Sequence, residues 1–164
     1  MSVPSITETG QYLSFKLEEE SFALDISNVR EVLDCTKITR VPQGPEFMLG
    51  VVNLRGGVVP VVDMRRKFGM GRTERTRNTC IIMEVELDGQ VTVLGALADS
   101  VQEVMEIDPE HIEPAPRIGI RMKTGFVKGM GRRDEQFIII LDINKVFSAE
   151  ELAMVNAVEE AEAV

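Results

Sequence analysis

The stretch GVVNLRGGVVPVVDMRRKF, residues 50–68, decides how the fold of this chain is interpreted. Its two apolar runs are separated by the glycine pair Gly56 and Gly57, and the second run ends at Asp63. Short valine-rich runs bounded by glycine or aspartate predict β-strands. The glycines allow a tight turn between the two strands and leave the side chain of Arg55 projecting from it. A planar guanidinium with five donors suits the binding of carbonyl or carboxylate oxygens, so Arg55 is a candidate binding residue.

A second stretch, GMGRRDEQFIIILDINKVF at residues 129–147, aligns with residues 50–68 without a gap, 79 positions further on (129 − 50). Upstream, residues 29–42 align with residues 101–114 at an offset of 72 (101 − 29). Chance similarity of two β-rich regions is the alternative, but the order of elements is the same both times, which predicts an internal repeat. The matched pairs are Val29 with Val101, Glu31 with Glu103, Val32 with Val104, Pro42 with Pro114, Gly50 with Gly129, Asp63 with Asp142, and Phe68 with Phe147.

The rest of the chain carries further strand signals. Residues 12–17 and 22–26 alternate between apolar and polar side chains and predict a hairpin around the acidic segment between them. Asp88-Gly89 suits the positive φ of a tight hairpin turn. Short strands in this number predict an all-β domain, and a two-unit repeat predicts two small barrels packed together. The other predicted strands are residues 50–53, 58–62, 79–87, 91–98, 101–107 and 137–141.

Helical signals are few. Residues 45–50 and 63–69 are short candidates, and Asp63 is a possible N-cap for the second of them. The repeat gives Asp142 the same capping role. The C-terminal segment, residues 148–164, is the clearest helix. Its signals are Ser148 and Glu151 at capping-box spacing, Phe147 and Leu152 at hydrophobic-staple spacing, and Leu152 with Val155 as residues that would dock on the body.

Composition excludes several classes of protein. The 164 residues, 44% of them hydrophobic and 27% charged, suit one soluble domain. A net charge of −9 argues against a nucleic-acid or anionic-membrane partner, which requires a basic surface. Residues 1–10 are expected to be a flexible N-terminus rather than a signal peptide, and no apolar run approaches the length of a membrane span. Cys35 and Cys80 have neither metal-site nor disulfide spacing and fit a reducing cytoplasm.

The sequence offers no catalytic, metal or cofactor site. His111 is the only histidine, and its spacing to other ligand types indicates neither a zinc site nor a catalytic dyad. Residues 125–133 contain glycines and bases at the wrong spacing for a phosphate loop. The basic residues 65–77 are interpreted as a solvated connecting loop. What remains is a binding protein, because two barrels leave a groove where a partner can sit. Arg55 could grip that partner or brace its own loop on nearby carbonyls, and these roles are compatible.

Three motifs carry a resemblance to a known family: FALDISNVREVL (22–33), GVVNLRGGVVPVVDMRRKF (50–68) and DSVQEV (99–104). The chain resembles the CheW family of bacterial chemotaxis coupling proteins over about residues 11–152. The resemblance implies two SH3-like five-stranded barrels, roughly residues 11–78 and 79–147 with strand exchange between them left open, before a C-terminal helix and acidic tail at 148–164. It also implies a non-catalytic cytoplasmic adaptor at receptor arrays on the inner face of the membrane. Such adaptors link methyl-accepting chemotaxis receptors to the regulatory domain of the histidine kinase CheA.

The same resemblance implies which residues bind these partners. Val29, Glu31 and Gly50 match family positions that are sensitive for kinase or receptor contact. Asn53 and Arg55 belong to the NLRG motif, whose arginine is associated with receptor coupling. By the logic of the repeat, Val101 and Val104 are expected on the other side of the groove.

Two alternatives stay open at this point. The chain could be the coupling domain of a CheV-like or CheA-like protein, which shares the fold. A small barrel that binds nucleic acid is less favoured, because aromatic residues make up 5% of the chain and tryptophan is absent.

Overall fold

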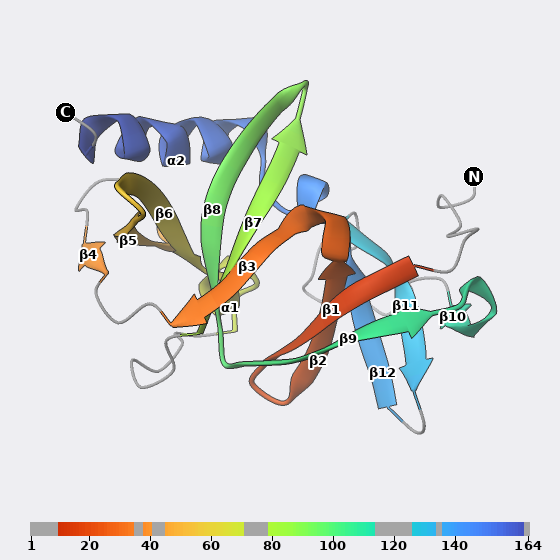
Figure 1. Cartoon of the computed structure of the whole chain (residues 1–164). Helices are drawn as coiled ribbons and strands as arrows, with labels where there is room; N and C mark the ends of the chain where they lie inside the picture. The colour runs from red at the N-terminus through yellow and green to blue at the C-terminus, as the bar shows by residue number, and fades with distance from the viewer. Residues whose placement is uncertain are drawn as a thin grey trace.

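The computed structural model describes residues 10–34, 38–40, 45–70, 79–113, 126–133 and 136–162, and this part of the chain is mostly β (Figure 1). Predictions on Cys35, Pro42, Pro114, residues 1–9 and residues 71–77 lie outside the described residues. The strands are β1 (Gly10–Leu17), β2 (Glu20–Asp25), β3 (Val29–Asp34), β4 (Thr39–Arg40), β5 (Met48–Leu54), β6 (Gly57–Asp63), β7 (Thr79–Leu87), β8 (Gln90–Ala98), β9 (Ser100–Ile107), β10 (Ile112–Glu113), β11 (Val127–Arg133) and β12 (Gln136–Leu141). The helices are η1 (Ile26–Asn28), α1 (Met64–Lys67), η2 (Pro109–His111), η4 (Ile143–Lys145) and α2 (Ala149–Glu162).

The strands form two curled sheets, here called barrel 1 and barrel 2. Barrel 1 has the order β10-β11-β12-β2-β1-β9, and barrel 2 has the order β3-β7-β8-β6-β5-β4. Each has one parallel pair, β12 with β2 and β6 with β8, among antiparallel neighbours. β4 and β10 are only two residues long, so each barrel has five longer strands and a short sixth one. The predicted all-β fold of two small packed barrels is confirmed.

The predicted repeat is confirmed down to strand register. Gly50 pairs with Val61 in barrel 2, and Gly129 pairs with Ile140 in barrel 1. Both members of each pair are 79 residues apart from their counterparts (129 − 50 and 140 − 61). The strand register also shifts immediately before each glycine, between Met48 and Gly50 and at the matching place in β11. A β-bulge at equivalent positions shows that the two units fold by the same local rules.

The barrels do not divide where the repeat divides. β7 and β8 pair with β3 and β6 in barrel 2, although they follow the expected boundary between residues 78 and 79. β1 and β2 pair in turn with strands of the second half, β9 and β12. The expected barrels 11–78 and 79–147 are therefore corrected to an arrangement in which each unit lends two strands to the other. The chain crosses between barrels through η1 and again at Asp99, the single residue between β8 and β9.

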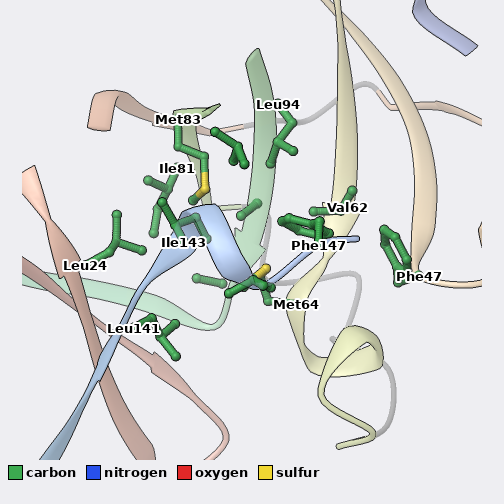
Figure 2. Packing of buried hydrophobic residues seen from close by; sticks show 14 of the residues in the cluster. Leu24, Phe47, Val62, Met64, Ile81, Met83, Leu94, Leu141, Ile143 and Phe147 are labelled. Atoms are coloured by element: carbon green, nitrogen blue, oxygen red, sulfur yellow. The ribbon is translucent and has the colours of Figure 1, made fainter. Parts of the chain in front are cut away.

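One hydrophobic core is shared by both barrels. Leu24 and Leu141 of barrel 1 lie in the same buried cluster as Val62, Ile81 and Met83 of barrel 2 (Figure 2). Met64, Ile143 and Phe147, from the segments that follow β6 and β12, fill the space between them (Figure 2). Burial of this kind is the main favourable term in folding, so the two barrels stabilise one another.

The predicted caps are present. The Asp63 carboxylate accepts a hydrogen bond from the Arg65 N–H at the start of α1, and Asp142 accepts one from the Asn144 N–H at η4. At α2 the Ser148 N–H donates to Glu151 Oε1 at 2.8 Å, and the Glu151 N–H donates to Ser148 Oγ at 3.1 Å. This is the reciprocal capping box. Leu152 and Val155 are buried, as expected, on the face of α2 that docks on the body.

Two sets of predictions were wrong. Residues 45–50 do not form a helical turn: residues 46 and 47 are in a turn, and β5 begins at Met48. Pairing with β6 along the whole of β5 overrides the weak local helical signal. β3, β4, β10 and β11 were not predicted as strands, because they are short or rich in glycine and charge. Their strand character depends on neighbours that are distant in the sequence.

Candidate partner-binding surface

Arg55 lies at the tip of the β5–β6 hairpin, as predicted. Arg55 has φ 51° and Gly56 has φ 82°, the two positive values that a tight hairpin turn of this type requires. Asn53 stabilises the turn, because its Oδ1 accepts a hydrogen bond from the Gly56 N–H at 3.2 Å. Asn53 therefore has a structural role in holding the hairpin tip, and Arg55 projects from that tip with 74% of its side chain exposed.

The exposed guanidinium binds a second predicted site residue, Glu31 of β3. Arg55 Nη1 donates to Glu31 Oε2 at 2.6 Å, and Nη2 donates to Oε1 at 3.1 Å. The hydrogen bonds to Glu31, together with its charge, raise the pKa of Arg55. β3 and β4 stand at opposite edges of barrel 2, so the pair ties the β5–β6 tip to the distant edge strand β3. The expected bonding to carbonyls is replaced by a two-point ion pair with a carboxylate.

Val29 begins β3 directly beside this ion pair. It pairs with Met83 of β7, is half-buried and packs against the shared core. A bulge between Val29 and Glu31 shifts the strand register at that point. The sequence-predicted residues Val29, Glu31, Asn53 and Arg55 are thus gathered on barrel 2, where an apolar side chain adjoins a charged pair.

Gly50 has a packing role. A Cβ atom at this position would lie 2.0 Å from the Thr39 carbonyl oxygen of β4, so no side chain fits. Gly129, its repeat counterpart, is equally close to β10: a Cβ there would lie 2.7 Å from Ile112 and 3.0 Å from the Glu113 carbonyl oxygen. Both glycines let a two-residue edge strand approach the main sheet. The main-chain packing at Gly50 explains why this position would be sensitive without touching a partner.

Val101 and Val104 lie on β9, the edge strand of barrel 1. Val101 is half-buried against the shared core, whereas Val104 is 51% exposed. The sequence interpretation missed Val32, the repeat counterpart of Val104, which is 42% exposed on the edge strand β3 of barrel 2. The signal was available, because the 72-residue offset pairs Val32 with Val104. An exposed valine on an edge strand is where another sheet or an apolar partner can add.

A hollow of about 470 Å³ opens along the second half of β9, facing Gly131 and Ile138 of the opposite strands. Beside it, one ligand atom from each of Asp108, Glu110 and His111 lies within 4.8 Å of the others. The sequence interpretation had found no carboxylate at ligand spacing from His111, and this is corrected. The three side chains are at least partly exposed on and beside the single turn of η2, which is an ordinary surface arrangement.

Among the described residues the buried polar side chains have structural partners. Ser14 Oγ bonds the main chain of Glu103, and Asp63 caps α1. Thr92 Oγ1 accepts a hydrogen bond from the Asn156 amide of α2. None of these three lies beside a base that would activate it as a nucleophile. In the described part of the chain, no helix has the length and apolarity needed to cross a membrane.

Comparison with known proteins agrees with this geometry. The family model of the CheW-like domain matches residues 11–151. The chain belongs to the CheW-like family. The CheW-like chain is 35% identical over 148 residues to chemotaxis protein CheW of Klebsiella aerogenes, covering 90% of this chain and 87% of that protein. It is 31% identical to chemotaxis protein CheW of Thermotoga maritima, covering 83% and 86%.

Among solved structures, the scaffolding protein TtCheW of Thermoanaerobacter tengcongensis superimposes on the CheW-like chain with a TM-score of 0.73. The two are 37% identical, and the match covers 87% of this chain and 94% of TtCheW. These matches place the CheW-like protein among the adaptors of chemotaxis signalling.

Proposed function

We propose that this CheW-like protein is a non-catalytic cytoplasmic adaptor that couples methyl-accepting chemotaxis receptors to the regulatory domain of a CheA histidine kinase. The observation that carries the proposal is the surface on barrel 2, where Val29 adjoins the Arg55–Glu31 ion pair. It combines an apolar anchor with a charged pair and offers no reacting group. Such a surface binds other proteins.

The kinase is assigned to the edge strand β3. Exposed Val32 and half-buried Val29 lie on this strand, and its free edge can accept a barrel of the same fold. A partner barrel placed there removes the edge from water and covers the valine. The two valines give specificity through packing, and the strand edge gives affinity through main-chain hydrogen bonds.

The receptor is assigned to the surface that includes Arg55. A receptor's helical hairpin tip presents apolar anchors at helical spacing, which Val29 and Val101 can meet from the two barrels. The Arg55–Glu31 pair is exposed, and exposed ion pairs are weak because water screens them. A partner carboxylate can therefore take over the guanidinium at little cost. Release of Glu31 on β3 would then carry the receptor's presence to the kinase edge without a covalent step.

Calorimetric titration into the regulatory domain of a CheA kinase from the same genome tests the proposal. Wild type and Arg55→Ala are expected to bind, and Val29→Asp is expected to lose binding. Arg30→Ala is the matched control for Arg55→Ala, because Arg30 forms a comparable exposed ion pair with Glu84 at 2.6 Å. A second titration into a receptor cytoplasmic fragment is expected to show weaker binding by Arg55→Ala and unchanged binding by Arg30→Ala. Absence of saturable binding by folded wild type to both partners would overturn the proposal.

A further inference from the structure

Arg65 of α1 holds an unusual position for a charged side chain. Only 15% of it is exposed, and its guanidinium reaches two carboxylates. Nη2 donates to Glu18 Oε1 at 2.8 Å, and Nη1 lies 3.4 Å from both oxygens of Asp99. Its Nε is buried and has no hydrogen-bond partner among the described residues. Burial alone would lower the pKa of Arg65, but the two carboxylates raise it.

These three residues come from segments that the two barrels contribute separately. Arg65 follows β6 of barrel 2, and Glu18 lies in the β1–β2 turn of barrel 1. Asp99 is the crossover residue, where the chain passes from β8 to β9. The carboxylate of Asp99 also accepts the Glu18 N–H at 2.6 Å, and its own N–H donates to the Lys16 carbonyl at 3.0 Å. The guanidinium therefore joins barrel 2 to both the hairpin turn and the crossover of barrel 1.

The repeat supplies a comparison within the same chain. Asn144 stands 79 residues after Arg65 (144 − 65), two residues beyond the repeated aspartate cap. Its Oδ1 accepts a hydrogen bond from the Glu86 N–H, in the β7–β8 hairpin of barrel 2, at 2.8 Å. Each short helix thus reaches the hairpin of the other barrel. One contact is a single neutral hydrogen bond, whereas the other is a charged cluster that also includes the crossover.

The charged version is a costly way to stabilise a fold. Removing a guanidinium from water carries a desolvation penalty that its ion pairs repay only in part, and the bare Nε adds to that penalty. A buried ionic cluster is better suited to specifying one arrangement, because its energy depends steeply on geometry. α1 lies close to the middle of the molecule, where the strands of the two barrels cross in the view of Figure 1.

We propose that Arg65 is a positioning residue, which holds the two barrels in the one relative orientation that presents Val29 of barrel 2 and Val101 of barrel 1 to the same partner. Val101 is the second residue after Asp99, so the Arg65–Asp99 contact determines where β9 begins. Arg65 itself is too buried to contact a partner. The partner-binding half of this inference rests on the proposed function, and the orientation half does not.

The first experiment measures orientation directly and needs no partner. Residual dipolar couplings of backbone amides are compared between wild type, Arg65→Gln and Arg66→Gln. Arg66 is the matched control, because it lies on the same helix and pairs with the well-exposed Glu46. For wild type and Arg66→Gln, one alignment tensor is expected to fit both barrels. For Arg65→Gln, the barrels are expected to require separate tensors. One tensor fitting both barrels of Arg65→Gln would overturn the proposal.

Two further variants separate positioning from stability. Arg65→Lys keeps the charge but cannot span both carboxylates, so its tensors are expected to lie between those of wild type and Arg65→Gln. If Arg65→Gln does not fold, Glu18→Gln takes its place, because it removes the shorter ion pair from a half-exposed side chain. A merely stabilising Arg65 would lower the melting temperature and leave a single tensor in every folded variant, which would also refute the inference.

The second experiment measures binding. Arg65→Gln is expected to bind a receptor cytoplasmic fragment about fivefold or more weakly than Arg66→Gln does, and to bind the kinase regulatory domain within about twofold of it. A partner that touches both barrels senses their orientation, whereas a partner on the β3 edge does not. Equal receptor binding by both variants would overturn the positioning role. Failure of wild type to bind either partner would instead refute the proposed function and leave the dipolar-coupling result standing.

Discussion

The ring of Phe47 lies 5.5 Å from the ring of Phe147, and this contact joins the two repeats across the shared core. The same contact occurs a second time with the partners exchanged, because Phe126 and Phe68 are their counterparts and lie 5.1 Å apart. The counterparts are 79 residues away in each case (126 − 47 and 147 − 68). Each aromatic pair therefore ties one repeat to the other, and neither barrel completes its packing alone.

This relationship predicts that the two barrels unfold together. Phe147→Ala is expected to lower the free energy of unfolding by about 3 kcal/mol or more, because it opens a cavity in the shared core. Urea unfolding followed by circular dichroism and by amide exchange is expected to give one transition in wild type and in the variant. Phe137→Ala is the control, since Phe137 is well exposed, and its effect is expected to be well below 1 kcal/mol. Two separate transitions in wild type would contradict the shared core.

Gly50 is predicted to tolerate no side chain. Gly50→Ala places a Cβ 2.0 Å from the Thr39 carbonyl, so β4 must move, at an expected cost of about 2 kcal/mol of stability. Gly57→Ala is the matched control in the same hairpin, because its Cβ would lie at an ordinary 3.5 Å from the Leu54 carbonyl. Thermal unfolding of both variants makes the comparison. Equal effects of the two substitutions would show that β4 gives way easily.

The capping box of α2 predicts a pH dependence. Burial opposes ionisation of Glu151, but the hydrogen bonds from Ser148 and the contact with Lys67 outweigh it and lower the pKa of Glu151 below 4.5. A carboxylate whose pKa is lower in the folded state stabilises above its unfolded pKa and loses that contribution as the pH falls through the folded value. Glu151→Gln is therefore expected to be less stable than wild type by about 1 kcal/mol at pH 7.

The difference between wild type and Glu151→Gln is expected to shrink as the pH is lowered from about 4.5 downward, where wild type protonates. Denaturant unfolding between pH 7 and pH 3 measures it. Glu150→Gln, one residue earlier and exposed, serves as the control and is expected to follow wild type. A difference that stayed constant across this range would assign the effect of Glu151 to packing instead of charge.

The two exposed edge valines predict different effects on partners. Val32→Lys is expected to weaken binding of the kinase regulatory domain by about tenfold or more, because it buries a charge in the proposed β3 interface. Val104→Lys changes the equivalent position of barrel 1 and is expected to leave that affinity unchanged. Neither substitution should alter the melting temperature appreciably, since both side chains are exposed. If Val104→Lys were the damaging variant, the kinase would be assigned to β9.

Features set by neighbouring residues were predictable from the sequence alone. The hairpin turn at Asp88-Gly89, the caps at Asp63 and Asp142 and the capping box at Ser148 all depend on contacts within a few residues. The repeat was also visible, because its offset is constant over many positions. These features determine that the chain is all-β, in two similar units with a C-terminal helix.

Only the tertiary structure decided which strands belong to which barrel and which side chains meet. The strand exchange follows from the parallel pairs β6–β8 and β12–β2, and parallel pairing leaves no local turn signal in the sequence. Arg55 meets Glu31, and Arg65 meets Glu18 and Asp99, only because closing the sheets brings these segments together. Sequence pattern records which residues a strand buries, whereas long-range ion pairs depend on the relative placement of the strands. That placement results from burying one core between both barrels.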